Sequence, residues 1–261
     1  MKERAEKLES NRLQKEGQKK FHDKEGQTQY NICRPHLGSR FFEYIWYRSL
    51  KIATKLYPYS FKGKELLCMC CGNGFEAEFF SHLGANVTGI DISPGNIKAA
   101  EERMKRFNFR AKFFVADTEN PSFKDKSFDI VVTHDALHHL SRPAVGLNQT
   151  TRIAKEGVII IEPFKSFINP FLIRAGLQRE WEDSGNYVYR FTVSELKKIF
   201  STAGFDKFRY KVQFLKKRHY ISQFHRFFDF PVTFYLARLI IYINNVLFSK
   251  IGNELVFVSY I

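Results

Sequence analysis

The residues best suited to chemistry are a glycine turn and an acidic residue that follow two short apolar runs. Gly72 and Gly74 come after the run Glu65–Met69, and Asp91 comes directly after the run Asn86–Ile90. Glycine lets the backbone approach a ligand without a Cβ in the way, and a carboxylate can accept hydrogen bonds from both hydroxyls of a ribose. We therefore expect a site for an adenosine-containing cofactor.

A strand–helix–strand unit must position these residues. Both runs have strand length, and the segment between them, Phe75–Leu83, carries apolar residues at helical spacing. In a parallel unit of this kind, the glycine turn and Asp91 lie at the same edge of the sheet. The free N–H groups of the helix N-terminus also point at whatever binds there.

The alternation of strands and helices continues along the chain. Residues 157–161 are wholly apolar, as expected for a parallel strand that is buried on both faces. This pattern predicts an α/β fold with a doubly wound sheet whose site lies at the carboxyl ends of the strands. Further strands are expected over 111–116, 127–133, 205–215 and 254–261, and helices over 39–57, 93–107, 142–154 and 192–203.

The composition limits the class of protein. The chain has 261 residues, 44% of them hydrophobic, which suffices for one large domain with a sizeable core. The first twenty residues are charged and lack the apolar segment of a signal peptide. Cys68, Cys70 and Cys71 share one predicted strand, so with Cys33 they form neither a disulfide framework nor a convergent metal site. We expect buried thiols, no metal and a cytoplasmic location.

The net charge of +14 is unevenly distributed. Nine Lys or Arg residues stand against two Asp between Phe205 and Lys250. Such a surface suits nucleic acid, anionic lipid head groups or phosphorylated small molecules, and an ordinary basic surface is an equal alternative. Nucleic acid is the least favoured partner, because the stretch has neither zinc-finger spacing nor the aromatic pattern of an RNA-binding sheet.

Residues 1–37 are predicted to be a polar N-terminal tail or frayed helix, because they have almost no apolar face. Residues 38–261 are predicted to form one domain. Within it, residues 164–190 are expected to be a lid over the acceptor pocket, and residues 220–250 an apolar helical insertion before the last strand.

The insertion approaches the length of a membrane-spanning helix, but Pro231 and Arg238 disfavour that interpretation. The strand expected over 254–261 must also return to the same sheet, and a single spanning helix would leave it on the other side of the membrane. Three alternatives remain: a buried helix, a homodimer interface, or a helix in the plane of a membrane surface. Basic residues just before the helix would suit anionic head groups: Lys216, Lys217, Arg218 and Arg226.

The chain resembles class I S-adenosylmethionine-dependent methyltransferases of the small-molecule, type 11-like group. The turn CMCCGNG is similar to the family's D-x-G-x-G-x-G motif, with Gly72 and Gly74 matching and Cys70 in place of the first glycine. Residues 116–132, ADTENPSFKDKSFDIVV, closely resemble the family's D-A-x-x-L-P-F-x-D-x-S-F-D passage. The resemblance implies a Rossmann-like methyltransferase fold with a mostly parallel seven-stranded sheet, an antiparallel last strand, and S-adenosyl-L-methionine as cofactor.

The resemblance also implies roles for individual residues. The turn would pass under the methionine part and ribose of the cofactor, Asp91 would bind the ribose hydroxyls, and Asp117 would bind the adenine amino group. His134 would begin the loop that faces the methionine end. The implied cofactor-binding set is Cys70, Gly72, Asn73, Gly74, Asp91, Ile92, Ala116, Asp117 and His134.

Methyl transfer to an oxygen of high pKa needs a general base, worth roughly 10²–10⁴-fold in rate. The candidates at the carboxyl edge are His139 first, then His138 and Glu162. An equal alternative is that the two adjacent histidines are packing residues at the start of a helix. We therefore expect methyl transfer to a small-molecule or lipid-linked acceptor, at oxygen, by an enzyme that can lie at the inner membrane surface.

Two other functions remain open. Gly72, Gly74 and Ala77, with Asp91, also fit a dinucleotide fingerprint. An NAD-dependent oxidoreductase is therefore the alternative enzyme. A non-catalytic methyltransferase-like binding subunit is the alternative outside enzymes.

Overall fold

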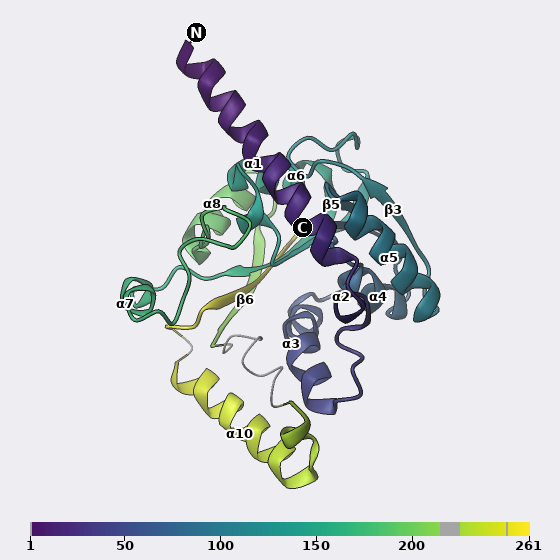
Figure 1. Cartoon of the computed structure of the whole chain (residues 1–261), viewed down its shortest axis with the longest axis vertical. Helices are drawn as coiled ribbons and strands as arrows, with labels where there is room; N and C mark the ends of the chain where they lie inside the picture. The colour runs from purple at the N-terminus through teal and green to yellow at the C-terminus, as the bar shows by residue number, and fades with distance from the viewer. Residues whose placement is uncertain (1, 215–224, 249) are drawn as a thin grey trace.

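A seven-stranded sheet forms the centre of the computed structural model, which describes residues 2–214, 225–248 and 250–261 (Figure 1). The strand order is β3-β2-β1-β4-β5-β7-β6. The neighbouring pairs from β3 to β5 are parallel, and β7 is antiparallel to both of its neighbours. The strands are β1 (Glu65–Met69), β2 (Asn86–Asp91), β3 (Ala111–Val115), β4 (Phe128–His134), β5 (Ala154–Pro163), β6 (Lys207–Gln213) and β7 (Glu254–Tyr260).

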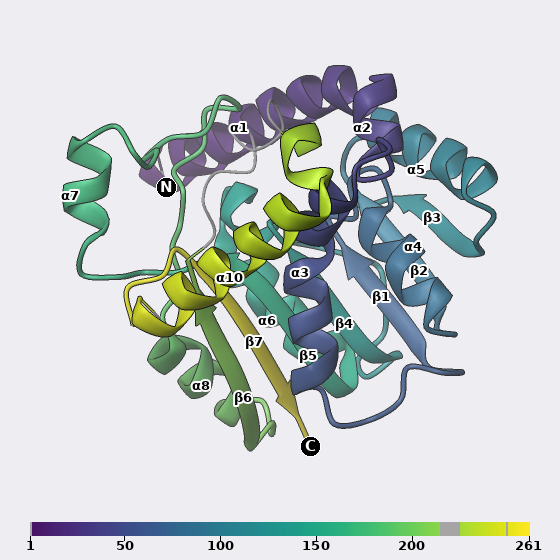
Figure 2. The same cartoon turned by 90° about the horizontal axis from the view of Figure 1, so that it is seen from below.

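Helices cover both faces of the sheet, as Figure 2 shows. Residues that alternate along each strand face opposite sides, so Leu66 packs with α3, α4 and α5 while Leu67 packs with α6 and α8. The helices are α1 (Lys2–Gly26), α2 (Gln29–Cys33), α3 (Arg40–Leu56), α4 (Phe75–His82), α5 (Pro94–Arg106), α6 (Pro143–Ile153), α7 (Asn169–Arg174), α8 (Val193–Thr202) and α10 (Pro231–Leu247), with 3-10 turns η1 (Leu137–His139) and η2 (His225–Asp229).

This architecture confirms the predicted doubly wound fold, its antiparallel last strand and the helical insertion before that strand. Two of the predicted helices begin at residues whose side chains cap them. The Ser39 side chain caps α3, and Thr192 forms a capping box with Glu195 at α8. The strand β5 begins at Ala154, earlier than predicted, because its first residues extend the pairing with β4.

Of the two forms predicted for the N-terminal segment, a polar tail or a frayed helix, the structure has a helix, and it is docked on the domain. Residues Lys2–Gly26 form one continuous helix that packs along α5. Apolar periodicity could not reveal this packing, because the helix contacts the domain through polar side chains. Gln18, for example, is only 5% exposed.

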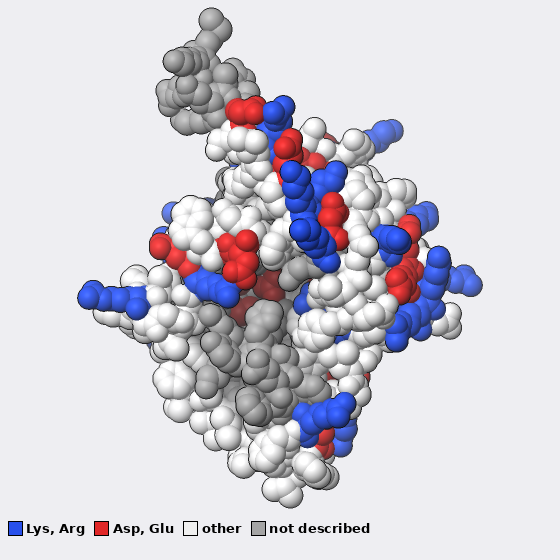
Figure 3. Space-filling model, in the orientation of Figure 1, with Lys and Arg blue, Asp and Glu red and all other residues white. Residues whose placement is uncertain are grey.

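The insertion helix α10 lies on the outer side of α3 and leaves most of its apolar side chains exposed. It buries Phe234 and Ala237 against Phe41 and Ile45 of α3. The opposite face is open to solvent, with Val232 79% exposed, and Figure 3 shows a largely uncharged surface at this end of the molecule. The prediction that the insertion is a buried helix is therefore wrong for the isolated chain.

No helix in the described part of the chain is long and apolar enough to span a membrane. The residues Lys216, Lys217 and Arg218, expected to face anionic head groups, lie outside the described residues.

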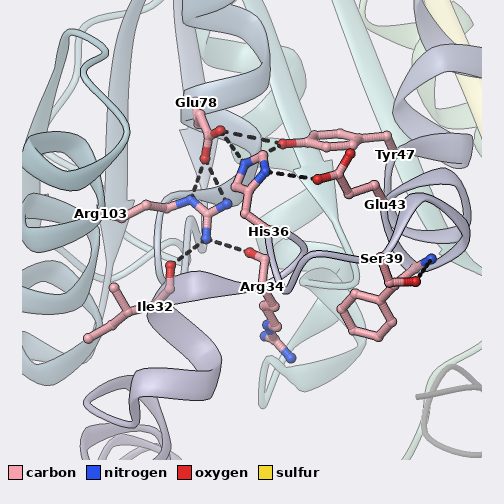
Figure 4. A network of polar contacts seen from close by, with 9 residues as sticks. Ile32, Arg34, His36, Ser39, Glu43, Tyr47, Glu78 and Arg103 are labelled. Atoms are coloured by element: carbon pink, nitrogen blue, oxygen red, sulfur yellow. Dashed lines mark hydrogen bonds and ion pairs between the residues drawn. The ribbon is translucent and has the colours of Figure 1, made fainter. Parts of the chain in front are cut away.

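A buried ion pair joins α4 to α5 beneath the N-terminal segment (Figure 4). Glu78 of α4 pairs with Arg103 of α5 at 2.7 Å, and the two side chains are 1% and 0% exposed. The Arg103 Nη1 donates to the carbonyl oxygens of Ile32 and Arg34 at 2.8 and 2.6 Å. His36 Nε2 lies 2.6 Å from the other oxygen of Glu78. This network therefore fixes the chain between α2 and α3 to the first half of the sheet.

This network shifts the pKa values of His36 and Glu78. The hydrogen bond to Glu78 raises the pKa of His36 above its usual value. Burial alone raises the pKa of Glu78, but the bond to His36 and the charge of Arg103 outweigh burial, so this pKa lies below its usual value.

We predict that Glu78→Gln lowers the free energy of unfolding by about 3–5 kcal/mol, because it leaves the Arg103 charge buried without a counter-charge. Urea unfolding of both proteins measures this difference. The control is Glu101→Gln, an exposed residue of the same helix as Arg103, which should change little. Equal effects of the two substitutions would contradict the role of the pair.

The same comparison should depend on pH. Because the folded-state pKa of His36 is raised, its contribution is complete below about pH 6.5 and is lost as the pH rises through the folded-state value. The stability difference between wild type and Glu78→Gln should therefore be larger at about pH 6 than at about pH 8. A difference that does not change with pH would show that His36 is not coupled to Glu78.

Candidate active site

The glycine turn between β1 and α4 has the conformation that a close-lying ligand requires. Gly72 and Gly74 have φ angles of 50° and 79°, and Gly74 is the N-cap of α4. A Cβ built on Gly72 would meet no atom within 4 Å, so the space above this residue is open. The turn therefore offers open backbone at Gly72 beside a helix N-terminus, whereas Asn73 and Gly74 are buried.

Cys70, which replaces the first glycine of the motif, also adopts a left-handed conformation, with φ of 51°. Its Sγ points to Thr118 and lies 3.1 Å from Oγ1. Burial raises the pKa of this thiol. The side chain is thus an inward-pointing neutral thiol that leaves the path of the turn intact, at the modest cost of a left-handed non-glycine residue.

Asp91 at the end of β2 is 6% exposed and holds the turn to the start of α5. Its Oδ2 accepts a hydrogen bond from Gly72 N at 2.9 Å, and its Oδ1 accepts from Ser93 N and Asn96 Nδ2 at 2.9 and 3.2 Å. A carboxylate has about four acceptor positions, so one remains for a ligand. Burial raises the pKa of Asp91 above its usual value, although the bonds from Ser93 and Gly72 oppose this effect.

The predicted adenine-side residues follow β3. Asp117 is half-buried and pairs through Oδ2 with Lys15 Nζ at 2.6 Å. The same ammonium group lies 2.8 Å from Glu119 Oε2, whose side chain is fully buried. Ala116 N donates to the carbonyl oxygen of Asp91, which places the ends of β2 and β3 side by side.

Helix α1 lies across this edge, and sequence analysis missed its contribution. Besides Lys15, Gln18 Nε2 donates to the carbonyl oxygen of His139, and Asp23 Oδ1 accepts from Ser93 Oγ and Gly95 N at 2.6 and 2.9 Å. The His22 ring lies 5.5 Å from the ring of His139. The signal in the sequence is polar rather than apolar: Lys15, Gln18 and His22 are at helical spacing.

Of the three predicted histidines, His134 and His138 each lie beside a different carboxylate, and His139 lies beside His138. His134 Nδ1 lies 2.7 Å from Glu76 Oε1. His138 Nδ1 lies 2.7 Å from Glu162 Oε2, and the rings of His138 and His139 are 4.1 Å apart. The structure thus places His138 beside both Glu162 and His139.

Glu162 organises this group. Its Oε1 accepts hydrogen bonds from Ala136 N and Leu137 N at 2.9 and 2.8 Å, and its side chain is fully buried. Burial alone lowers the pKa of His138, but the bond to Glu162 outweighs burial and holds this pKa above its usual value. Burial and the nearby His138 and His22 hold the pKa of His139 well below its usual value.

The predicted lid over residues 164–190 contacts the histidines. Asn186 is fully buried, and its Nδ2 donates to the carbonyl oxygen of His138 at 2.8 Å. The segment therefore joins β5 to the same edge of the sheet that carries Asp91 and Asp117.

One group in the described part of the chain brings three candidate metal-ligand atoms within 4.8 Å of one another: His134, Asp135 and Glu254. Two of them already have partners. His134 Nδ1 is bonded to Glu76, and Glu254 Oε2 accepts from Ser49 Oγ at 2.5 Å. The group gives no reason to propose a metal site.

The residues present fit the cofactor that the resemblance implies. Gly72 leaves an open backbone surface, Asp91 retains an acceptor position, and the Asp117 carboxylate is 32% exposed. All three lie at the carboxyl edge of adjacent strands, where ligands of open α/β sheets bind.

Comparison with known proteins finds a family model that matches the segment carrying this edge. The family described as "Methyltransferase domain" matches residues 67–161. The chain is 27% identical over 157 residues to a ubiquinone biosynthesis O-methyltransferase of Dinoroseobacter shibae, covering 57% of this chain and 62% of that protein. It is 37% identical over 100 residues to a 2-methyl-6-phytyl-1,4-hydroquinone methyltransferase of Synechocystis, covering 38% of this chain and 31% of that protein.

The chain therefore spans less than two thirds of the length of these curated relatives. Among solved structures, the fold is similar to phosphoethanolamine N-methyltransferase 2 of Haemonchus contortus in complex with S-adenosyl-L-methionine. That similarity has a TM-score of 0.62 and 20% sequence identity, and it covers 93% of this chain and 59% of that one.

We predict that Glu162→Gln lowers the pKa of His138, because it removes the negative charge that offsets burial. An NMR titration of the histidine rings measures the change, which should bring this pKa below the usual value of a histidine. Glu156→Gln, a substitution near the other end of β5, is the matched control and should leave the His138 titration unchanged. An unaltered His138 titration in Glu162→Gln would contradict the pairing.

Proposed function

We propose that this chain, which contains a class I S-adenosylmethionine-dependent methyltransferase domain, methylates a hydroxyl oxygen of a small, apolar, quinol-like acceptor. The observation that carries the proposal is the domain match over residues 67–161, which includes the glycine turn, Asp91 and Asp117. The named relatives that act in ubiquinone and phytylhydroquinone synthesis support the acceptor class.

The cofactor side of the site consists of residues on β1, β2 and β3. Gly72, Asn73 and Gly74 would pass under the methionine and ribose, with the remaining acceptor position of Asp91 on a ribose hydroxyl. Asp117 would accept a hydrogen bond from the adenine amino group, with Ile92 and Ala116 beside the ring. S-adenosylmethionine, when bound, supplies a methyl group on a sulfonium whose departing thioether is neutral. The protein must therefore mainly align the reactants and exclude water.

His138 is the best-placed general base. Its Nδ1 faces Glu162, so the imidazole tautomer that donates to this carboxylate leaves the Nε2 lone pair free to take the acceptor's hydroxyl proton. The raised pKa of His138 makes it a stronger base than His139, whose pKa is lowered. We therefore place His138 before His139, the reverse of the order expected from sequence, and assign Glu162 to orienting His138.

We further propose that the enzyme is a peripheral protein of the cytoplasmic membrane surface, with the lid of residues 164–190 over an acceptor that is lipid-like. The exposed apolar face of α10 supports this location. The four cysteines are free thiols, as suits the cytoplasm. A homodimer formed through α10 is the second candidate for covering this face.

An NAD-dependent oxidoreductase and a non-catalytic binding subunit are the competing functions, and calorimetry separates the first of them. We predict that the chain binds S-adenosylmethionine and S-adenosylhomocysteine at micromolar concentrations and does not bind NAD. Asp91→Ala should weaken cofactor binding at least about tenfold, since a hydrogen bond from a neutral donor to a charged group contributes roughly 1.5–3 kcal/mol. Circular dichroism confirms that the variant is folded, and binding of NAD alone would refute the proposal.

The second prediction separates an enzyme from a binding subunit. With labelled S-adenosylmethionine and a catechol carrying a short apolar side chain, His138→Ala should lower kcat about 10²–10⁴-fold. Cofactor affinity should stay nearly unchanged. His82→Ala, an exposed histidine of α4, is the matched control and should keep full activity. Equal activity of the two variants would remove His138 from the mechanism.

A further inference from the structure

A basic groove separate from the cofactor edge lies between α3 and α10. It has a volume of about 640 Å³. Its lining contains one acidic residue, Glu43, which pairs with His36 at 3.4 Å. The six cations that line this α3/α10 groove are Arg40, Arg48, Lys51, Lys55, Lys211 and Arg238.

Within the described residues these cations lack direct ion-pair partners, although the Glu254 carboxylate lies near Arg48. In residues 2–214, 225–248 and 250–261, none of the six forms an ion pair. Several lie over aromatic rings instead. The Arg40 guanidinium is 4.8 Å from the centre of the Phe234 ring, and that of Arg238 is 5.2 Å from the centre of the Tyr44 ring. Rings of this kind hold a cation in place but leave its positive charge uncompensated.

Arg48 is the strongest sign of a missing ligand. Its side chain lines the groove, the residue is only 9% exposed, and its Nη1 has no hydrogen-bond partner among the described residues. The Tyr44 side chain and the Glu254 carboxylate both support the Arg48 charge, but Glu254 Oε2 already accepts from Ser49 and Gln213, and Nη1 keeps no partner among the described residues. A buried charged donor without a partner is costly, and an anion in the groove would supply the missing acceptor.

The side of α10 that faces away from the groove is apolar. The outer face of α10 exposes Leu236, Leu239, Ile240, Ile243 and Leu247, each at least 44% exposed. Helix α10 itself contributes only one of the six cations, Arg238, while α3 and β6 contribute the others. Cations beside a helix with a large apolar face are what a helix in a membrane surface presents to anionic lipids. An exposed patch of this kind marks an interaction site.

We propose that the α3/α10 groove binds the phosphate head group of an anionic membrane lipid, with the acyl chains against the outer face of α10. A second copy of the chain is a poorer occupant, because a two-fold interface would place the six cations of one groove near those of the other. The proposal rests on the membrane contact proposed above but not on methyl transfer.

Vesicle flotation of the full chain tests the proposal. Vesicles of phosphatidylcholine containing phosphatidylglycerol should bind the chain, and pure phosphatidylcholine vesicles should bind it at least about tenfold more weakly, since each cation near an anionic surface contributes about fivefold. Lys51→Gln with Lys55→Gln, two exposed positions of α3, should weaken binding roughly 30-fold. Lys105→Gln with Lys112→Gln changes the net charge equally outside the groove and should have little effect.

Two further variants separate the head-group site from the apolar contact. Arg48→Gln should weaken binding to anionic vesicles, provided that circular dichroism shows a folded chain. Leu239→Gln with Ile243→Gln should weaken binding to both kinds of vesicle. Calorimetry with S-adenosylmethionine should give the same affinity for every variant, so that failure of this proposal is distinct from failure of the proposed function.

Three outcomes would overturn the proposal. Equal binding to neutral and anionic vesicles would exclude a head-group site. Displacement of the vesicles by inorganic phosphate or glycerol phosphate at comparable affinity would show a site for soluble phosphorylated compounds. A chain that is dimeric by light scattering and binds neither kind of vesicle would assign the face of α10 to a second copy.

Discussion

The buried ion pair between Glu78 and Arg103 is the constraint on which the cofactor edge depends. It ties α4 to α5, and the N-termini of these two helices carry the glycine turn and the residues that hold Asp91. Burying two charges is unfavourable unless their hydrogen-bonding groups are well satisfied. His36 and the carbonyl oxygens of Ile32 and Arg34 satisfy them here. The segment before α3 is therefore part of the structure that shapes the site.

Helix α1 is attached differently, because its contacts with the site are polar. The bonds from Lys15, Gln18 and Asp23 each join it to a different part of the edge, from Asp117 to His139. Net contributions of such bonds are only about 1 kcal/mol each, whereas the sheet and the helices on its faces share extensive apolar cores. Helix α1 is thus held at the cofactor edge through polar contacts rather than through the apolar cores of the domain.

The sequence predicted those features that depend on neighbouring residues. The apolar stretch 157–161 of β5, the glycine turn, the acid at the end of β2 and the helices that begin near residues 39 and 192 all follow from local patterns. Contacts between distant residues could not be predicted in this way. Lys15 reaches Asp117 across 102 positions, and Arg103 reaches Glu78 across 25. The preference for His138 over His139 also required the structure, because adjacent histidines look alike until Glu162 is placed beside one of them.

The order of the strands places the proposed cofactor residues and the insertion helix at opposite sides of the sheet. The residues assigned to the cofactor lie on β1, β2 and β3, at one side of the sheet, while α10 connects β6 to β7 at the other. His138 and Glu162 belong to the segments that follow β4 and end β5, between these two sides. Helix α3 bridges them, since its apolar face packs on the sheet while Arg48 and Lys51 line the basic groove. On the function proposed above, an acceptor that arrives from the side of α10 would meet the cofactor near His138, the residue proposed as the base for its hydroxyl.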